Sequence, residues 1–168
     1  LQTVTGVVAV TGPGITVTLD DSADVVDGSD AQRGSSGFEA GRVSAADLQI
    51  VSNGLWAAGA EAISINGQRL TTRSAIRFAG QAILVDFRPL VRPYVVTAIG
   101  DAKALQSSFG SSPTGSYLKS LEDNYGILVA VETHSDLTCP AGATSALVSA
   151  SSPPHGIPSS SSPPTEAT

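Results

Sequence analysis

The chain has 168 residues, of which 41% are hydrophobic and 5% aromatic, and its formal net charge is −6. This is enough for one domain with an aliphatic core, and the acidic balance excludes a protein that binds DNA through a broad basic face. No apolar run approaches the roughly 20 residues of a membrane helix. Because the chain begins at Leu1 and contains no Met, we expect a fragment from which a targeting or anchoring segment could have been removed.

The first predicted element is a β-hairpin centred on the Gly-Pro-Gly stretch at residues 12–14. Proline in the second position and glycine in the third suit a type II turn. Apolar residues alternate with polar ones over residues 15–20, which is the period of a half-buried strand. Residues 20–43 are acidic and then rich in Gly and Ser. We predict a long loop there, mobile over residues 27–41.

Residues 44–58 are predicted to form the first helix, because Ser44 and Asp47 have the spacing of a capping box. Residues 61–66 then form a strand, so that the chain builds a strand–helix–strand unit with the strand at 15–20. Such crossovers are right-handed and make their two strands parallel. The apolar residues that share one stripe of the helix are Leu48, Val51, Leu55 and Ala58.

The second half of the chain repeats this pattern. Residues 82–88 and 93–99 are predicted to form a hairpin whose turn is bracketed by prolines. A helix begins at Ala102, is interrupted by the sequence GSSPTG, and resumes until a glycine stops it at residue 126. Residues 127–132 supply the closing strand.

This element order predicts an α/β (α+β) fold, a ferredoxin-like two-layer plait. Its mixed, mainly antiparallel sheet would carry two helices on one face, with extra strand and hairpin elements. We expect a single domain over residues 1–140. Residues 141–168 are rich in Ser and Pro, and we predict a disordered tail because this composition cannot bury enough surface to offset its ordering entropy.

Tests for catalytic and metal-binding patterns fail. Cys139, the only cysteine, lies five residues after His134, and nothing in the sequence orients the imidazole. The aspartates of residues 20–30 lack the ligand order of a calcium loop. The Gly-Pro-Gly stretch lacks the lysine of a phosphate-binding loop and precedes a strand. We therefore predict a protein that is not an enzyme and has no cofactor or metal.

A polar segment from Asn66 to Arg77 is the candidate binding site. Asn-Gly is the strongest two-residue hairpin signal, and arginines spaced by four share one side of either a strand or a helix. A row of guanidinium groups binds carboxylates or phosphates. The sequence alone favours the simpler interpretation that these arginines pair with the acidic loop. The candidate residues are Asn66, Gln68, Arg69, Arg73 and Arg77.

Four stretches of the sequence resemble the YlxW-like bacterial proteins, the domain-of-unknown-function 881 family. They are GPGITVTLDDS, ADLQIVSNGLWAAGAEAISINGQRL, AIRFAGQAILVDFRPLVRPYVVTAIGD and YLKSLEDNYGILVAVE, and the likeness covers roughly residues 5–135. The composition, rich in Ala and Gly and poor in Lys, resembles that of an actinobacterial member. The resemblance implies a plait-like domain behind an N-terminal membrane-spanning segment and a coiled coil. It assigns no enzymatic activity, and no role to residues 66–69.

On this resemblance we expect a non-enzymatic, extracytoplasmic domain of a membrane-anchored protein. It would act at the cell membrane as a protein-interaction module in cell division or cell-envelope assembly. Its partners would be membrane or envelope proteins and not nucleic acid. The missing coiled coil offers a route to a homo-oligomer, and the missing anchor is the only contact with the membrane. The alternative is a sensor domain that binds a small anionic ligand at Asn66–Arg77.

Overall fold

The computed structural model describes residues 6–26, 40–80 and 82–142. Most of the predicted loop at 27–41 and nearly all of the predicted tail lie outside the described residues. The strands are β1 (Val10–Asp20), β2 (Ala62–Ile65), β3 (Gln68–Arg69), β4 (Ile76–Ala79), β5 (Ala82–Val85), β6 (Arg88–Pro89), β7 (Tyr94–Ile99) and β8 (Leu128–Cys139). The helices are α1 (Ala23–Val26), α2 (Ala45–Ala57), α3 (Ala102–Gly110) and α4 (Pro113–Tyr125).

The larger sheet has the strand order β3-β2-β7-β1-β8, and each neighbouring pair is antiparallel. β1 and β2 run in the same direction, as the strand–helix–strand unit predicts, because both are antiparallel to β7, which lies between them. They are not neighbours, so the expected mixed sheet is corrected to one whose described pairs are all antiparallel. With helices packed on this sheet, the fold is of the α+β class.

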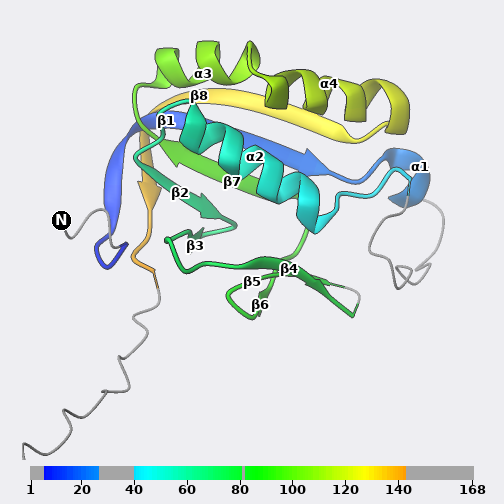
Figure 1. Ribbon diagram of the computed structural model, residues 1–168, viewed down its shortest axis with the longest axis horizontal. Helices are drawn as coiled ribbons and strands as arrows, with labels where there is room; N and C mark the ends of the chain where they lie inside the picture. The colour runs from blue at the N-terminus through cyan, green and yellow to red at the C-terminus, as the bar shows by residue number, and fades with distance from the viewer. Residues whose placement is uncertain (1–5, 27–39, 81, 143–168) are drawn as a thin grey trace, which may run out of the picture.

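The helices cover one face of the larger sheet, and a second sheet with the order β4-β5-β6 lies below it (Figure 1). The expectation of two helices is corrected, because the GSSPTG interruption separates α3 from α4. Ser112 caps the new helix and Pro113 begins it, a position where a missing N–H costs nothing. The main buried side chains between sheet and helices are Ile15, Val17, Leu19, Leu48, Val51, Leu55, Ile63, Ile65, Val96, Leu105 and Phe109.

The predicted hairpin at residues 12–14 is wrong, because β1 continues through this stretch as a single strand. The Gly-Pro-Gly sequence forms an irregularity in the pairing with β8, between Gly12 and Gly14, instead of a turn. Gly14 is pressed against β7, where a Cβ atom would lie 2.0 Å from the carbonyl oxygen of Ala98. Glycine is therefore required here for a close approach of two strands.

The predicted hairpin of residues 82–88 and 93–99 is also wrong. β5 pairs with β4 and β6 in the small sheet, whereas β7 pairs with β1 and β2 in the larger sheet. The chain turns back at Asp86 and Phe87, before both of the prolines, Pro89 and Pro93, that were expected to bracket the turn. In both segments apolar and polar residues alternate, as they do in a strand. This alternation does not determine which other strand each segment pairs with.

The helix ends predicted from the sequence are confirmed. The Ser44 side chain accepts from the Asp47 N–H, and the Asp47 carboxylate accepts from the Ser44 N–H at 2.7 Å. Asp101 caps α3, and Gly126 ends α4 in the left-handed conformation. The predicted final strand is much longer than expected, since β8 continues to Cys139 alongside β1. Within the described residues, no helix is long and apolar enough to cross a membrane.

Candidate functional site

Asn66 and Gly67 form the tight turn between β2 and β3, as predicted, with φ angles of 46° and 75°. The Asn66 side chain is engaged within the fold. Its Nδ2 donates to the carbonyl oxygen of Val91 at 2.6 Å, and its Oδ1 accepts from the N–H of Val95 at 2.7 Å. Asn66 therefore holds the chain that leads into β7.

Arg69 is only 5% exposed on β3. Its Nη1 donates to the carbonyl oxygens of Val8 and Pro140, each at 3.3 Å. Next to this contact, the N–H of Gly142 donates to the carbonyl oxygen of Gly6 at 2.7 Å. Arg69 thus joins the first and last described segments of the chain, and this position keeps it away from a surface ligand.

The remaining candidates lie toward the small sheet. Gln68 accepts a hydrogen bond through Oε1 from Nη1 of Arg88 at 3.1 Å. Arg73 is exposed in the turn before β4, and Arg77 is exposed on β4. The structure therefore does not gather Arg69, Arg73 and Arg77 into one row. The described part of the acidic loop contacts a different arginine, since Asp20 and Asp21 lie 3.9 and 3.7 Å from Nη1 of Arg92.

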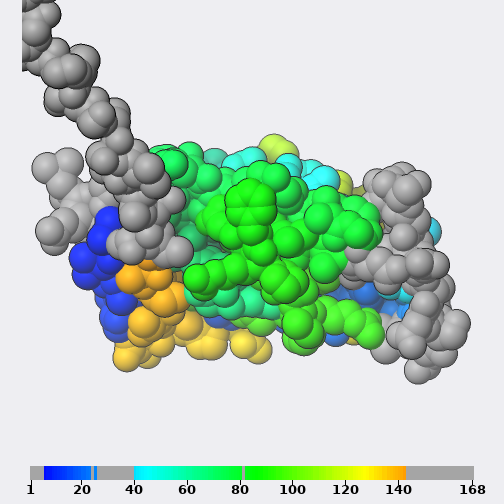
Figure 2. All heavy atoms as spheres, turned by 90° about the horizontal axis from the view of Figure 1, so that it is seen from below, coloured from blue at the N-terminus to red at the C-terminus, as the bar shows by residue number. Residues whose placement is uncertain are grey.

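Arg77 belongs to an exposed surface that we call the outer face of the small sheet. Arg77 is paired with Leu84, and Leu84 with Pro89, so their side chains share one face, while Ile83 and Val85 are fully buried on the other. The atoms of this sheet occupy the centre of the view from below (Figure 2). We define the outer face by Arg77, Leu84, Phe87 and Pro89. Arg88 is paired with Val85, so it starts from the other face and reaches Gln68 of the larger sheet.

Phe87 is the most unusual residue of this face, because 76% of it is exposed. Asp86 and Phe87 have φ angles of 49° and 68°, and a turn with two positive φ values favours Asn-Gly or Asp-Gly. A left-handed conformation costs roughly 1–2 kcal/mol in a residue that has a Cβ. The fold therefore holds a large apolar ring in solvent at a position that suits glycine, and such strain is concentrated at functional sites.

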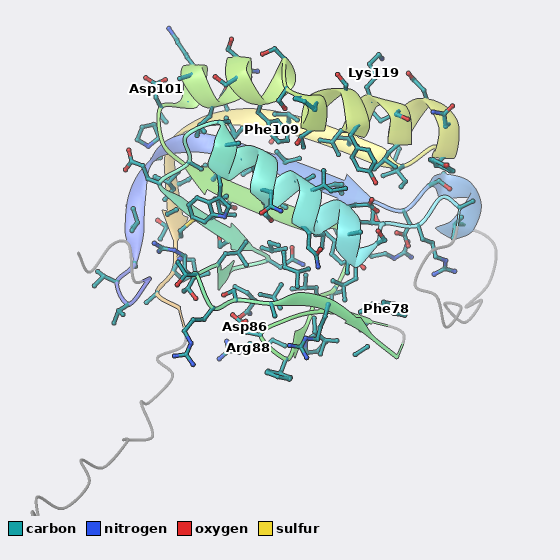
Figure 3. The ribbon with its side chains drawn as sticks, viewed as in Figure 1. Phe78, Asp86, Arg88, Asp101, Phe109 and Lys119 are labelled. Carbon is teal, nitrogen blue, oxygen red and sulfur yellow. The ribbon has the colours of Figure 1, made fainter. Side chains whose placement is uncertain are left out.

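The turn is fixed by Asp86. Its Oδ2 accepts from the Ser74 hydroxyl at 2.7 Å, and its Oδ1 accepts from the Ala75 N–H at 2.9 Å. Figure 3 shows Asp86 and Arg88 on the small sheet, on the opposite side of the molecule from Asp101 and Lys119 on the outer helices. The outer face is thus well removed from α3 and α4.

The outer face carries a positive charge in an acidic chain. Arg77 lies on it, whereas the whole chain has a net charge of −6. Among the residues that the structure describes, none of Arg73, Arg77 and Arg88 has an ion-pair partner. The sequence reasoning identified two of these arginines but missed Phe87. The signal it could have used is an Asp-Phe pair where a tight turn calls for Asp-Gly.

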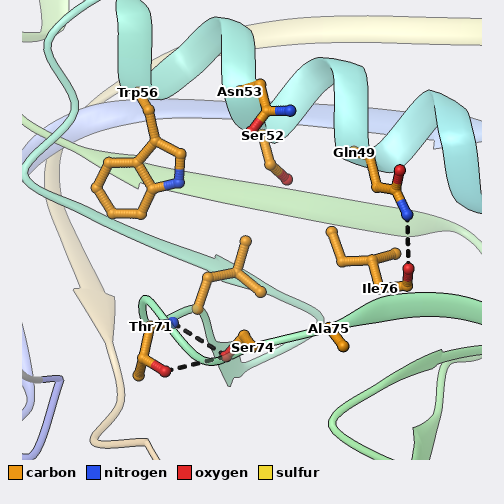
Figure 4. Close-up of a pocket in the computed structure, with 9 residues that line it drawn as sticks. Gln49, Ser52, Asn53, Trp56, Thr71, Ser74, Ala75 and Ile76 are labelled. Atoms are coloured by element: carbon orange, nitrogen blue, oxygen red, sulfur yellow. Dashed lines mark hydrogen bonds between the residues drawn. The ribbon is translucent and has the colours of Figure 1, made fainter.

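A hollow of about 360 Å³ lies between α2 and the segment that leads into β4 (Figure 4). Among the described residues, no arginine lines it, although the segment belongs to the candidate binding site of the sequence analysis. Its wall on the side of α2 includes Gln49, whose amide donates to the carbonyl oxygen of Ile76 at 2.6 Å. The lining residues are Gln49, Ser52, Asn53, Trp56, Leu70, Thr71, Ser74, Ala75 and Ile76.

Cys139 and His134 have separate surroundings on β8. The thiol of Cys139 is fully buried, 3.5 Å from Oγ of Ser64, and burial raises its pKa. Nε2 of His134 lies 3.0 Å from Oγ1 of Thr16 and 3.7 Å from the Glu132 carboxylate. A buried thiol with a raised pKa is a poor nucleophile. Within residues 6–26, 40–80 and 82–142, no group of three or more acidic, His or Cys side chains could hold a metal ion.

Comparison with curated proteins shows relatives in bacteria. The chain is 42% identical to the UPF0749 protein Rv1823 of Mycobacterium tuberculosis (strain ATCC 25618 / H37Rv) over 135 residues, which are 80% of this chain and 44% of that protein. It is 35% identical to the UPF0749 protein YlxW of Bacillus subtilis (strain 168) over 103 residues, 61% of this chain and 42% of that protein. The chain thus spans less than half the length of these relatives.

A solved structure has the same fold. It is the crystal structure of an uncharacterized conserved protein from Mycobacterium tuberculosis, with a TM-score of 0.65 and 24% sequence identity. The match covers 90% of this chain and 95% of that one. The family model described as "Bacterial protein of unknown function (DUF881)" matches residues 1–150. The chain is therefore a member of the DUF881 family of bacterial proteins, as the four sequence stretches predicted.

Proposed function

We propose that the chain is a non-enzymatic protein-interaction domain that binds an acidic, partly apolar segment of a partner through the outer face of the small sheet. The observation that carries this proposal is Phe87, which is 76% exposed and held at a φ of 68°. Burying a phenylalanine side chain contributes roughly 1.5–3 kcal/mol. This gain in a complex would be comparable to the roughly 1–2 kcal/mol that the left-handed conformation of Phe87 costs.

The charge of the face supports an acidic partner. Carboxylates that approach the outer face would meet the guanidinium group of Arg77, which has no ion-pair partner among the described residues. Charge complementarity of this kind raises association rates and excludes basic partners. An aromatic anchor with flanking arginines is also the usual composition of an interface hot spot.

The geometry supports a protein-binding surface more than it supports a pocket for a small anion. Arg69 is buried and bound to main-chain carbonyls, and none of the described residues that line the nearby hollow is an arginine. A sensor for a small anionic ligand would need several guanidinium groups directed at one point. The alternative of an anion sensor at Asn66–Arg77 therefore has less support than a protein interface.

The wider setting of the domain is part of the same proposal. A membrane anchor, an extracytoplasmic position and a role in cell division or envelope assembly are supported by the family resemblance. The relatives are also more than twice as long as the segment matched here. As for the fold, the order β2-β7-β1-β8, with α2 joining β1 to β2, supports a ferredoxin-like plait with β3 and the small sheet as additions.

A photocrosslinking amino acid at position 84 of the full-length protein, expressed in its own host, tests the interface. We expect crosslinks to an acidic segment of a membrane or envelope protein, and loss of these crosslinks in Arg77→Glu. Lys103→Glu is the matched control, because Lys103 is exposed on α3 and its reversal changes the net charge equally. Crosslinks that persist in Arg77→Glu, or that Lys103→Glu abolishes to the same extent, contradict the proposed face.

A second experiment tests the location independently. An alkaline phosphatase fused after the domain in the full-length protein is expected to be active, because this enzyme folds only outside the cytoplasm, where its disulfides form. An inactive fusion, with an active cytoplasmic reporter at the same site, would contradict the extracytoplasmic position without affecting the crosslinking result.

A further inference from the structure

The hollow between α2 and the segment Leu70–Ile76 has the size and the polar lining of a ligand site. Its volume of about 360 Å³ falls in the range of roughly 300–1,000 Å³ that small-molecule sites occupy. The described residues that line it supply amides, hydroxyls, aliphatic groups and one indole, and none of them has a charged side chain. The ligand that fits such a lining is polar and neutral.

Three side chains on α2 are available to a ligand. Trp56 is the only tryptophan of the chain and is 40% exposed, although tryptophan is usually well buried. Among the residues described by the structure, neither the Trp56 indole N–H nor the Asn53 amide has a hydrogen-bond partner. The amide of Gln49 is held in place by its bond to the Ile76 carbonyl, so its second N–H and its oxygen stay free to bind.

On the opposite wall, the main-chain N–H groups are already used within the protein. The N–H groups of Leu70, Thr71, Ser74 and Ala75 all donate to acceptors inside the protein. A peptide therefore cannot extend a hydrogen-bonded ladder along this wall, as it would along a free strand. Recognition falls to hydroxyls and amides, which both donate and accept hydrogen bonds.

An anion is disfavoured on two grounds. The carboxylate of Asp86 lies behind this wall, with its Oδ2 only 2.7 Å from the Ser74 hydroxyl. Within the described part of the chain, no arginine or lysine lines the hollow to offset that negative charge. A ligand whose own groups alternate between donor and acceptor, and which has a flat apolar side, matches the lining better.

We infer that the hollow binds a neutral saccharide. Its C–H face stacks on the ring of Trp56, and its hydroxyls pair with the amides of Asn53 and Gln49, as Figure 4 allows from the positions of these side chains on α2. This site is separate from the outer face of the small sheet, so the inference does not depend on the proposed protein partner.

Titration of the chain with cellotetraose and chitotetraose, followed by tryptophan fluorescence, tests the inference. Since Trp56 is the only tryptophan, a saturable change in emission reports this hollow directly. We expect at least one of the two sugars to bind with a Kd of ~1 mM or lower, so that binding is nearly saturated at a sugar concentration of about 10 mM. Inorganic phosphate and a peptide of residues 143–168 are titrated in parallel as an anion and as a proline-rich ligand.

Two variants assign the binding to named side chains. Asn53→Ala is expected to weaken sugar binding about five-fold or more through the loss of its hydrogen bonds. Asn124→Ala is the matched control, since Asn124 is exposed on α4 and its amide bonds only to Ser120. Trp56→Phe, measured by calorimetry, is expected to weaken binding as well. No saturation with either sugar, saturation only with phosphate or the peptide, or equal affinities of the Asn53→Ala and Asn124→Ala variants would overturn the inference.

Discussion

The guanidinium carbon of Arg77 lies 4.9 Å from the centre of the Phe87 ring. This cation–π contact joins β4 to the turn that follows β5, and it holds the ring against the outer face of the small sheet. An arginine placed over an exposed aromatic ring keeps the ring accessible while it restrains its position. Phe87 is therefore presented to solvent in a defined place, which is what a docking surface requires.

Phe87→Gly is expected to separate stability from binding. Glycine removes the left-handed strain of roughly 1–2 kcal/mol. The substitution also removes a cation–π contact of about 0.5–1 kcal/mol. In addition, glycine raises the conformational entropy of the unfolded chain, which destabilises the fold by a similar amount. The free energy of unfolding, measured by urea denaturation, should therefore stay within about 1 kcal/mol of the original, while crosslinking from position 84 is lost. A loss of several kcal/mol would show that Phe87 has a structural role instead.

Gly14→Ala is expected to be strongly destabilising. The new Cβ would lie 2.0 Å from the main-chain oxygen of Ala98, and neither strand can move without breaking the pairing of β1 with β7. Overpacking of this kind costs typically about 1–3 kcal/mol, and a clash with main chain is at the upper end. Urea denaturation measures the difference.

Gly110→Ala is the control for that substitution. Gly110 is the last residue of α3, and nothing lies within 4 Å of the position that its Cβ would take. Alanine should leave stability unchanged or raise it by up to about 1 kcal/mol. Equal effects of the two substitutions would mean that the close approach of β1 and β7 is absent in solution.

The thiol of Cys139 is expected to be unreactive in the folded protein. It is fully buried, and desolvation raises its pKa, so little thiolate forms near pH 8. Reaction with Ellman's reagent should be slow in buffer and complete at once in denaturant. Rapid reaction of the folded protein would contradict the burial of β8 at this end and reopen a nucleophilic role.

Tyr117 links α4 to the start of α2, because its hydroxyl donates to the carboxylate of Asp47. Asp47 is 5% exposed and also accepts from Ser44. Tyr117→Phe should lower the free energy of unfolding by about 1–2 kcal/mol near pH 7, since a buried acceptor loses a partner. Urea denaturation at that pH measures the loss, and no loss would show that this bond contributes nothing.

The same tyrosine gives a pH dependence. Burial, followed by the hydrogen bond and the charge of Asp47, raises the pKa of Tyr117 above its ordinary value of 10.0. A raised pKa contributes stability that is fully present below pH 10 and is lost as the pH rises, because the unfolded tyrosine ionises first. The advantage of the original chain over Tyr117→Phe should therefore be constant from pH 7 to 9 and shrink above about pH 10. An advantage that grows above that pH would contradict the assignment.

Features set by neighbouring residues were predictable from the sequence. The capping box of Ser44 and Asp47, the tight turn at Asn66 and the end of α4 at Gly126 all formed as expected. Each depends on the preferences of a few adjacent residues. The choice of strand partners was not predictable in this way, because it depends on residues far apart in the chain.

Gly14 shows why the prediction of strand pairing failed. The Gly-Pro-Gly sequence fits a turn as well as an irregular strand, and only the approach of Ala98, more than 80 residues later, decides for the strand. The candidate site failed for a related reason. Arg69, Arg73 and Arg77 are four residues apart, but they lie on β3, in a turn and on β4. Residues four apart share one side only within a single strand or helix, so the rule does not apply to these three.

The hydrogen bond between Gly142 and Gly6 has a mechanical consequence. Both ends of the described fold leave it at one corner, away from α1 (Figure 1). Tension applied through these two ends would pull on the Val10–Cys139 end of the β1–β8 pair and open its hydrogen bonds one after another. Opening one bond at a time takes less force than shearing many at once, so β8 is expected to peel away from β1 first.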